Sequence, residues 1–508
     1  MSQRNVLFII IDQLRADALF GNLAKHVDLP NLRAFMEDAT TFERNYSVTN
    51  PCGPSRASLL TGRYAMNHRS IRNGTPLRHD TPNIATEMRK AGYLPLLIGY
   101  TDTSMDPRAF AEGDPILNTY EMPMHGFHEV VEMRLEKSYP WRAYLQSKGY
   151  DLPKDYADHY VPVAQGSERK INDPAFYKAE DSDTAFLTNA CLNELALRTD
   201  QNWFAHLTYI RPHPPLVAPA PYNAMYDPAS LPLPERIGSQ ADEQAVHPFF
   251  APAHENQTAQ SFVDGFPDLQ VNDDVINTMR AVYLGLATEV DAHIGRVIEF
   301  LKETDQWDNT LIVVSADHGE MLGDHHAWGK HNVYDAAYHT PLIVRDPDHA
   351  AGHGLKISKP TESVDLAPTI LDWVDQDIPH SMDGRSLMPF LTGENPDWPD
   401  YSFSELDFGD PTEPTIWQQK LELGPSQCNL NILRGPRYTL VHFSGGLPPL
   451  LFDREGEGEM RNVANDPEMA PVLLKMTQKL LSHRMENTDH TLASIMNKPG
   501  GPVRGQRR

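Results

Sequence analysis

The chain is short of cysteine, of positive charge and of long apolar runs, and each shortage excludes a class of protein. Three cysteines in 508 residues cannot build the disulfide framework that staples small secreted domains. Lysine and arginine number 44 against 69 aspartates and glutamates, and the net charge of −25 argues against a nucleic-acid-binding protein, which needs a basic face. No apolar run approaches the roughly 18 residues of a membrane span. The apolar run at 6–11 is too short for a secretory signal, so we expect a cytoplasmic protein that contacts no membrane.

The pattern of apolar runs and helical segments changes near residue 390. A chain of 508 residues exceeds the size at which one hydrophobic core stops growing, so we expect two domains. Up to residue 390, short apolar runs alternate with helical patterns; beyond it, short β-like runs precede a helical pattern at 470–485. We therefore place a larger domain at residues 1–390 and a smaller one at 391–508. The Gly- and Arg-rich tail at 500–508 is expected to be loose or to reach a neighbouring subunit.

Four short apolar runs in the larger domain end in polar residues that could carry chemistry. The runs are nearly continuous, as expected of strands buried on both faces of a parallel sheet. The run at 6–11 is followed by Asp12 and Gln13, and the run at 94–99 by Tyr100, Thr101 and Asp102. The run at 203–210 is followed by Arg211, Pro212 and His213, and the run at 311–315 leads to Asp317, His318 and Gly319. Ligands of open α/β sheets bind beyond the carboxyl ends of the strands, so we expect these four groups to face one crevice.

Helical patterns alternate with these runs, which predicts an α/β domain with a large, mostly parallel sheet flanked by helices. The helices are expected at 30–38, 83–90, 183–197 and 274–302. In the last and longest, we expect Glu289 and Asp291 to lie on the solvated or capped side rather than to bind a ligand. Two irregular stretches, 105–178 and 227–273, are predicted to wall the crevice and shape substrate choice.

Residues 52–62 read C-G-P-S-R-A-S-L-L-T-G and are the most informative segment of the chain. Pro54 suits the first turn of a helix, and Gly62 suits the position just past its end. Cys52 would then lie at a helix N-terminus, where unpaired N–H groups and the helix dipole favour an anion. Arg56, about one turn further, would offer N–H donors to a sulfate or phosphoryl oxygen. The structural alternative is a small buried thiol ahead of an ordinary helix.

This segment resembles the signature of type I sulfatases, in which C-x-P-S-R directs oxidation of the cysteine to formylglycine. Other segments are similar to the phosphonate monoester hydrolase branch of that family, within the alkaline phosphatase superfamily. They are Gln13, the D-H-G sequence from Asp317, the Y-I-R-P-H-P-P-L sequence around His213 and the G-D-H-H-A-W-G-K sequence that ends at Lys330. The resemblance extends from Asn5 to the P-P-L-L-F-D sequence that ends at Asp453.

The resemblance implies a fold, an activity and partners. The fold would be alkaline phosphatase-like, with a smaller C-terminal α+β domain in which one helix packs on an antiparallel sheet. Members of the branch hydrolyse phosphonate monoesters, phosphodiesters and aryl sulfates at one site, often as homo-oligomers. We therefore expect a dimer or tetramer that acts on a small anionic ester, and a formylglycine-generating enzyme as the partner that modifies Cys52.

Asp12, Asp317 and His318 form a mixed set of oxygen and nitrogen ligands. Two carboxylates and an imidazole suit one divalent ion, Ca²⁺ or Mn²⁺, and the nitrogen donor favours Mn²⁺ somewhat. The resemblance implies that an oxygen of formylglycine, made from Cys52, completes the ligand set. A single aspartate at a strand end is more often a turn or cap residue, so the prediction depends on the three residues together.

The resemblance also implies roles for other residues. Arg56, His213 and Lys330 would bind the substrate's equatorial oxygens, and His213 or Lys330 would give a proton to the leaving oxygen. Positions near the nucleophile that we expect to contact the substrate are Tyr100, Asn73, Gln13 and Asp102. We interpret the nearby histidines as structural; these are His325, His326 and His331.

The implied mechanism uses the aldehyde of formylglycine as a device for both attack and release. Its hydrate attacks sulfur or phosphorus through one hydroxyl, whose pKa the metal lowers. Loss of the proton from the second hydroxyl then collapses the covalent adduct and expels the inorganic anion. Because that last step is carbon chemistry, the same site can accept sulfate and phosphorus esters.

Three alternatives stay open on the sequence. One is a dedicated arylsulfatase of the same fold, and another is a phosphodiesterase whose unmodified Cys52 thiol is the nucleophile. The third is a silent anion-binding protein in which Cys52 is never oxidised. Asp102 adds a departure, because the branch more often has a small hydroxyl residue there. A carboxylate facing the site would repel dianionic esters and favour monoanionic ones, whereas one turned away would cap a loop.

Overall fold

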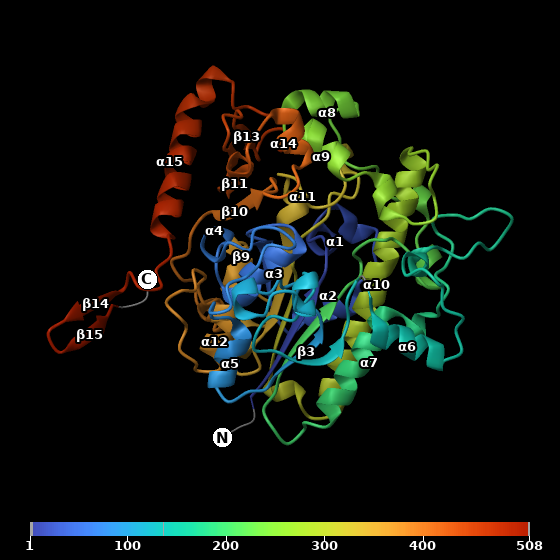
Figure 1. Ribbon diagram of the computed structural model, residues 1–508, viewed down its shortest axis with the longest axis horizontal. Coiled ribbons are helices and arrows are strands. Elements are labelled where there is room, and N and C mark those ends of the chain that lie inside the picture. Colours follow the sequence, from blue (N-terminus) through green and yellow to red (C-terminus); the bar gives the residue numbers. More distant parts are fainter. Residues whose placement is uncertain (1–3, 136, 506–508) are drawn as a thin grey trace.

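The computed structural model describes residues 4–135 and 137–505, and a nine-stranded sheet lies at the centre of this part of the chain (Figure 1). The strand order is β4-β3-β5-β1-β6-β7-β2-β8, with β9 also paired to β2. The strands are β1 Asn5–Ile11, β2 Thr40–Tyr46, β3 Pro95–Gly99, β4 His128–Glu132, β5 Phe204–Tyr209, β6 Thr310–Ala316, β7 His339–Arg345, β8 Lys356–Ile357 and β9 Thr361–Glu362. Only β7 runs antiparallel to both of its neighbours, so the predicted mostly parallel sheet is confirmed.

The alternating side chains of β1 enter two separate hydrophobic layers. Leu7, Ile9 and Ile11 pack with α2 Pro30–Glu37, α7 Asp183–Ala196 and α10 Asp273–Glu303 on one face of the sheet. The residues between them pack on the other face with α3 Cys52–Thr61, α5 Ile84–Lys90 and α12 Leu366–Trp373. Every residue of β1 is buried, which explains why its apolar run is continuous rather than alternating.

The four strands predicted to carry chemistry are neighbours. In the order β3, β5, β1, β6 they run parallel to one another, and their carboxyl ends reach the same edge of the sheet. The polar residues that follow them are thereby brought to one place, as the sequence predicts. The remaining α-helices of the described residues are α1 Asp17–Phe20, α4 Ala65–His68, α6 Tyr139–Ser147, α8 Gln240–Val246, α9 Phe250–Asn256, α11 Asp335–Tyr338, α13 Met388–Leu391, α14 Ile416–Leu421 and α15 Ala470–Glu486.

The charged residues of the long helix α10 behave in two ways. Asp291 accepts N–H bonds from Asn31 at 3.0 Å and Leu32 at 2.7 Å, and so caps the first turn of α2. The expectation that Glu289 is solvated was wrong, because its side chain is buried against α7 and the segment after β5. Burial, with a further contribution from Asp183, raises the pKa of Glu289 to about 8, so this carboxyl is largely uncharged at neutral pH.

The C-terminal part is a four-stranded antiparallel sheet with one long helix against it, as expected from the family resemblance. Its strands are β10 Ser402–Asp407, β11 Asn429–Arg434, β12 Tyr438–Phe443 and β13 Leu450–Asp453, and the helix is α15. A hairpin of β14 Ile495–Lys498 and β15 Gly501–Arg504 projects from the body beyond α15 (Figure 1). Part of the tail predicted to be loose or an arm is therefore a strand, and residues 506–508 lie outside the described residues. A contact with a neighbouring subunit stays a prediction.

One hydrophobic cluster joins the two regions that the sequence divides at residue 390. Tyr46, Phe250 and Tyr334 pack in it with residues of the antiparallel sheet, and the Trp417 indole N–H donates to the carbonyl of Phe249 at 3.1 Å. The part of the irregular stretch 227–273 from the end of α8 into α9 thus covers this junction. Among the described residues, no helix is both long enough and apolar enough to cross a membrane.

Candidate active site

Cys52 is the first residue of α3, as the sequence predicts. Pro54 lies in the first turn, and the helix ends at Gly62, which adopts the left-handed conformation with φ 63°. The N–H of Gly53 donates to Oδ1 of Asn73 at 2.9 Å, which places Asn73 directly beside the first turn of the helix that begins at Cys52. A Cβ on Gly53 would come within 2.9 Å of that oxygen and 3.1 Å of the Asp102 carbonyl, so glycine is required by the close approach of these two segments.

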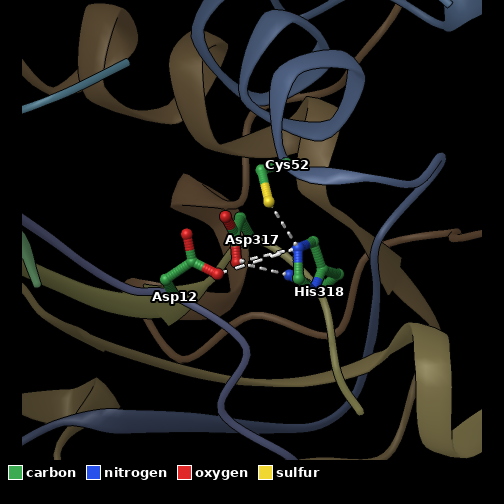
Figure 2. A group of neighbouring side chains, drawn as sticks. All are labelled: Asp12, Cys52, Asp317 and His318. Carbon is green, nitrogen blue, oxygen red and sulfur yellow. Dashed lines mark hydrogen bonds and ion pairs between the residues drawn. The ribbon is translucent and has the colours of Figure 1, made fainter. Parts of the chain in front are cut away.

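Four side chains meet below this helix end: Asp12, Cys52, Asp317 and His318 (Figure 2). One ligand atom of each lies within 4.8 Å of the other three. Asp12 follows β1 and Asp317 follows β6, and these strands are paired in register from Asn5 with Thr310 to Ile11 with Ala316. The parallel pairing therefore sets the two carboxylates side by side. Nε2 of His318 lies 3.3 Å from the sulfur of Cys52.

The hydrogen bonds of these residues leave lone pairs facing one another. Nδ1 of His318 bonds the Gly319 carbonyl at 3.0 Å, which keeps its proton there and leaves the Nε2 lone pair for the centre of the group. Burial, followed by the charge of Lys330, lowers the pKa of His318 to about 3, so the ring is neutral. Oδ1 of Asp12 is buried without a hydrogen-bond partner among the described residues. An unpaired buried carboxylate oxygen and a neutral imidazole nitrogen fit a divalent cation.

The two carboxylates differ in their ionisation. Burial raises the pKa of Asp317 to about 7, and the nearby Asp12 adds to that effect. At Asp12 burial acts in the same direction, but the surrounding histidines, Arg56 and Lys330 outweigh it and lower the pKa. Burial, then Asp12, raises the pKa of the Cys52 thiol well above its usual value. The site therefore carries a charged Asp12 and an uncharged Cys52 thiol.

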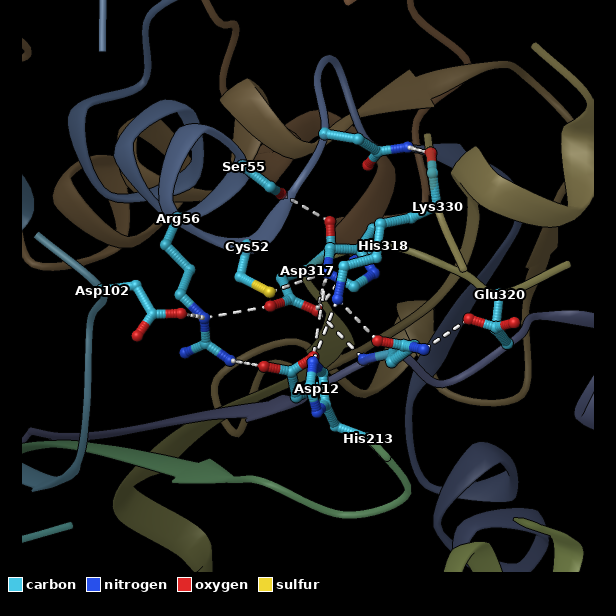
Figure 3. Close-up of polar contacts among 12 residues, drawn as sticks. Asp12, Cys52, Ser55, Arg56, Asp102, His213, Asp317, His318, Glu320 and Lys330 are labelled. Atoms are coloured by element: carbon cyan, nitrogen blue, oxygen red, sulfur yellow. Dashed lines mark hydrogen bonds and ion pairs between the residues drawn. The ribbon is translucent and has the colours of Figure 1, made fainter. Parts of the chain in front are cut away.

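Arg56 connects the two carboxylates (Figure 3). Its Nε donates to Asp317 at 3.0 Å, and its Nη2 donates to Asp12 and to the Tyr100 hydroxyl, each at 3.1 Å. Its Nη1 donates to Oγ1 of Thr208 at 2.8 Å and to the Tyr100 carbonyl at 3.3 Å. The five N–H groups are thus all engaged with protein acceptors. The guanidinium therefore holds the two carboxylates in place, and its predicted contact with substrate oxygens stays a prediction.

Lys330 and His213 form a second group on the other side of Asp12. Nζ of Lys330 lies 3.0 Å from Nε2 of His213 and donates to Oε1 of Gln13 at 2.8 Å. His213 is partly exposed, and its Nδ1 bonds the Pro214 carbonyl at 2.6 Å, so its Nε2 accepts from the lysine. Burial and then Lys330 lower the pKa of His213 to about 3, whereas Cys52 and Asp12 outweigh burial at Lys330 and raise its pKa. The shared proton therefore lies on Lys330.

Gln13 follows Asp12 at the end of β1 and bridges several residues of the site. Its side-chain amide donates to Glu320 and accepts from Lys330, so both ends of the amide are used inside the protein. Its backbone adopts the left-handed conformation with φ 67°, and its N–H donates to Asp317 at 3.1 Å. Gln13 therefore orients Lys330 and Asp317, and its contact with substrate stays a prediction.

Tyr100 and Asp102 both lie against Arg56, and Asp102 is on the side of Arg56 that faces away from Lys330 (Figure 3). The Tyr100 hydroxyl donates to Asp12, and the Arg56 guanidinium lies over the Tyr100 ring at 4.1 Å. Oδ2 of Asp102 lies 3.9 Å from Nε of Arg56, so this carboxyl faces the site rather than capping a distant loop. Burial, partly offset by Arg56, raises the pKa of Asp102 to about 8.

Three residues of this network were not predicted from the sequence. Glu320 accepts N–H bonds from Leu322 and Gly329, and it holds Gln13 in place. Ser55 donates to the Asp317 carbonyl, and Thr208 accepts from Arg56. Glu320 could have been found, since it directly follows the D-H-G sequence. Thr208 gives no signal, because it is one of several small residues inside a buried strand.

A cysteine at a helix N-terminus lies beside two carboxylates and an imidazole at the edge of a mostly parallel sheet. This combination is that of a metal-dependent ester hydrolase. Residues 4–376 match the Sulfatase family, and the chain belongs to that family. It is 38% identical to the multifunctional alkaline phosphatase superfamily protein PehA of Trinickia caryophylli over 99% of each chain. It is 26% identical to an arylsulfatase of Clostridium perfringens, over 82% of this chain and 84% of that one.

Solved structures are similar over the whole length. The phosphonate monoester hydrolase SpPMH from Silicibacter pomeroyi is 64% identical, with a TM-score of 0.98 and full coverage of both chains. The phosphonate monoester hydrolase of Agrobacterium radiobacter is 38% identical, with a TM-score of 0.94, over 99% of this chain and 100% of that one. The chain is therefore a hydrolase of the sulfatase family with the fold of these phosphonate monoester hydrolases.

Proposed function

We propose that this hydrolase cleaves phosphonate monoesters, phosphodiesters and aryl sulfate monoesters at one site. The observation that carries the proposal is the buried group of Asp12, Cys52, Asp317 and His318 at the N-terminus of α3. The similarity to two phosphonate monoester hydrolases and to an arylsulfatase supports both classes of ester. A site that serves all three must recognise a singly charged tetrahedral centre rather than one element.

Asp12, Asp317 and His318 would hold one divalent cation, and their donor set suits Ca²⁺ or Mn²⁺. The sulfur of Cys52 lies where an oxygen of formylglycine, the residue that the family makes from this cysteine, would lie. The bound ion supplies positive charge that lowers the pKa of the nucleophile and stabilises the attacked group. Cys52 is only 5% exposed and the whole of α3 is buried, so the formylglycine-generating enzyme would act before the chain has folded.

The chain's own residues would bind and orient the ester. The charged Lys330 faces the group and is free to donate to a non-bridging oxygen of the substrate when the ester displaces its contact with Gln13. The N-terminus of α3 adds its partial positive charge on the same side. The hydrogen-bonded pair of His213 and Lys330 holds one proton, which would pass to the leaving oxygen as its bond to sulfur or phosphorus breaks.

The burial of the thiol weighs against the alternative nucleophile. An unmodified Cys52, whose pKa is raised by burial and by Asp12, gives little thiolate at neutral pH. A phosphodiesterase that used this thiol would therefore start from an unreactive form. The dedicated arylsulfatase differs from the main proposal only in range of substrate. The cytoplasmic location and the homo-oligomer expected from the sequence remain part of the proposal.

Parallel assays on one preparation test the proposal. An aryl sulfate, an aryl phenylphosphonate and a bis-aryl phosphate should all turn over, and Cys52→Ala should abolish all three activities. Cys428→Ala, which removes another buried thiol outside the site, should retain them. Failure of wild-type protein on all three esters would refute the substrate assignment, and full activity of Cys52→Ala would refute the assigned nucleophile.

A further inference from the structure

Arg211, two residues before His213, is a fully buried cation that has no contact with the metal-type ligands. Its side chain is 0% exposed, and its guanidinium lies 5.2 Å from the centre of the Tyr160 ring. Desolvating a guanidinium is costly, so a buried arginine needs strong partners. The identity of those partners indicates what this residue is for.

The guanidinium binds the loop that carries the catalytic imidazole. Nη1 of Arg211 donates to the carbonyl of His213 and to that of Pro215, each at 3.0 Å. One planar donor group thus binds the backbone at His213 and again two residues later. The His213 ring itself is hydrogen-bonded through Nδ1 to the Pro214 carbonyl at 2.6 Å and through Nε2 to Lys330. The loop has no helix or strand of its own at this point. Its backbone is held by these bonds, by the bond from the His213 N–H to the Ile210 carbonyl at 3.0 Å and by the bond from the Leu216 N–H to the Phe262 carbonyl at 2.7 Å.

A single carboxylate anchors the guanidinium from behind. Nε of Arg211 donates to Oδ2 of Asp183 at 3.0 Å, and Asp183 is the first residue of α7, where it is 3% exposed. The neighbouring Glu289 is also buried, but it is largely uncharged at neutral pH, as described above. Arg211 therefore has one counter-ion, on the rigid helix α7, and the chain of contacts runs from α7 through Arg211 to His213.

We propose that Arg211 is a positioning residue, anchored on Asp183, that holds His213 where the His213–Lys330 pair can protonate the leaving oxygen. The inference rests on the proposed function. When the bond between the leaving oxygen and phosphorus or sulfur breaks, the oxygen keeps the electron pair and takes the proton from the nitrogen of the pair. The pair regains a proton from water as the product leaves. Displacing His213 would weaken this step without touching the nucleophile.

Two esters that differ only in their leaving group can distinguish this positioning role from a purely structural one. A 4-nitrophenolate departs with little help, whereas an unsubstituted phenolate needs its oxygen protonated in the transition state. General-acid assistance accounts for roughly 10²–10⁴ in rate. If His213 is misplaced, kcat/KM should therefore fall mainly for the ester with the poorer leaving group. Damage to the nucleophile or to the fold should lower kcat/KM of both esters equally.

The test compares kcat/KM of wild type, Arg211→Lys and Asp183→Asn on 4-nitrophenyl and phenyl phenylphosphonate. For Arg211→Lys we expect a loss of about 100-fold with the phenyl ester and no more than about threefold with the nitrophenyl ester. Asp183→Asn should give the same pattern with a smaller loss, and it carries the test if Arg211→Lys does not fold. Circular dichroism checks the fold of each variant.

A matched control is Arg434→Lys. Arg434 is also 0% exposed, donates to Asp335, and lies 4.9 Å and 4.8 Å from the rings of Tyr46 and Tyr338, but it serves the C-terminal sheet. Its variant should lower both activities by the same factor, if at all. Equal losses on the two esters with Arg211→Lys or Asp183→Asn would overturn the inference. If wild-type protein cleaves neither ester, the proposed function fails instead.

Discussion

At the scale of single residues, Arg56 makes contacts that the sequence does not reveal. The sequence places it one turn after Cys52 and so predicts a substrate ligand. In the fold it bridges Asp12 and Asp317 and is 1% exposed. Two carboxylates that close together need a cation between them, and the arginine partly supplies that charge.

Arg56→Met should therefore destabilise the protein as well as inactivate it. Removing one partner of a buried ion pair costs about 3–5 kcal/mol, because the remaining charges stay buried without compensation. Arg437→Met provides a control, since Arg437 pairs with Asp453 at the surface with 48% of its side chain exposed, and such pairs contribute about 1 kcal/mol or less. Urea unfolding measures both. Similar losses for the two variants would contradict the role assigned to Arg56.

Asp102 gives a prediction about the charge of the substrate. Its pKa of about 8, raised by burial, means that the carboxyl is largely neutral at pH 6.5 and ionised at pH 9. A phosphate monoester is a dianion through most of this range, whereas an aryl sulfate is a monoanion. Asp102→Asn should raise the ratio of phosphatase to sulfatase kcat/KM by roughly tenfold at pH 9 and little at pH 6.5. An equal ratio in variant and wild type at pH 9 would show that Asp102 does not repel substrate.

At the scale of secondary-structure elements, the strands and the helix of Cys52 could be predicted because they carry local signals. Continuous apolar runs marked β1, β3, β5 and β6 to within a residue or two, and Pro54 with Gly62 marked α3. The hydrogen bonds between elements could not be predicted. Gln13 reaches Glu320 and Arg56 reaches Thr208 across more than 150 positions, and neither pair has a spacing that a sequence pattern can reveal.

A buried histidine on β5, His206, should make the stability of the protein depend on pH. His206 is 1% exposed, its Nδ1 bonds the Phe8 carbonyl, and burial followed by Arg56 lowers its pKa to about 3. The unfolded chain therefore binds one proton more than the folded chain between about pH 6.5 and 3, and this contribution to stability is lost as the pH falls.

His206→Gln, which does not titrate, should remove that contribution. From pH 7 to pH 5 the wild type should lose about 2 kcal/mol relative to this variant in urea unfolding. The exposed His128→Gln should follow the wild type at both values. An unchanged difference between His206→Gln and wild type across this range would contradict a neutral buried imidazole.

At the scale of the whole molecule, the sequence divides the chain at residue 390, but the hydrophobic core does not. The cluster that contains Tyr46, Phe250 and Tyr334 also contains Leu406, and the chain beyond residue 390 supplies many of its other members. Beyond residue 390 the apolar runs no longer alternate with helical patterns, and this change of pattern reveals the change from a parallel to an antiparallel sheet. It cannot reveal that the two sheets share a core, since shared packing leaves no local pattern.

The shared core predicts one unfolding transition. Trp417→Ala removes an indole that is 2% exposed, which should cost about 3–5 kcal/mol and move the whole calorimetric transition to lower temperature. Leu474→Ala, at a side chain that is 61% exposed on α15, should have little effect. Two separated transitions in the Trp417→Ala variant would show that residues 391–508 unfold independently.

In the active protein, we propose, residue 52 lies among Asp12, Asp317 and His318 as formylglycine rather than as cysteine. Peptide mass spectrometry across residue 52, on protein of known specific activity, tests this modification most directly. We expect a lighter residue, an aldehyde in place of a thiol, in a fraction that rises in proportion to the specific activity. Fully active protein in which residue 52 retains its sulfur would show that formylglycine is not the nucleophile.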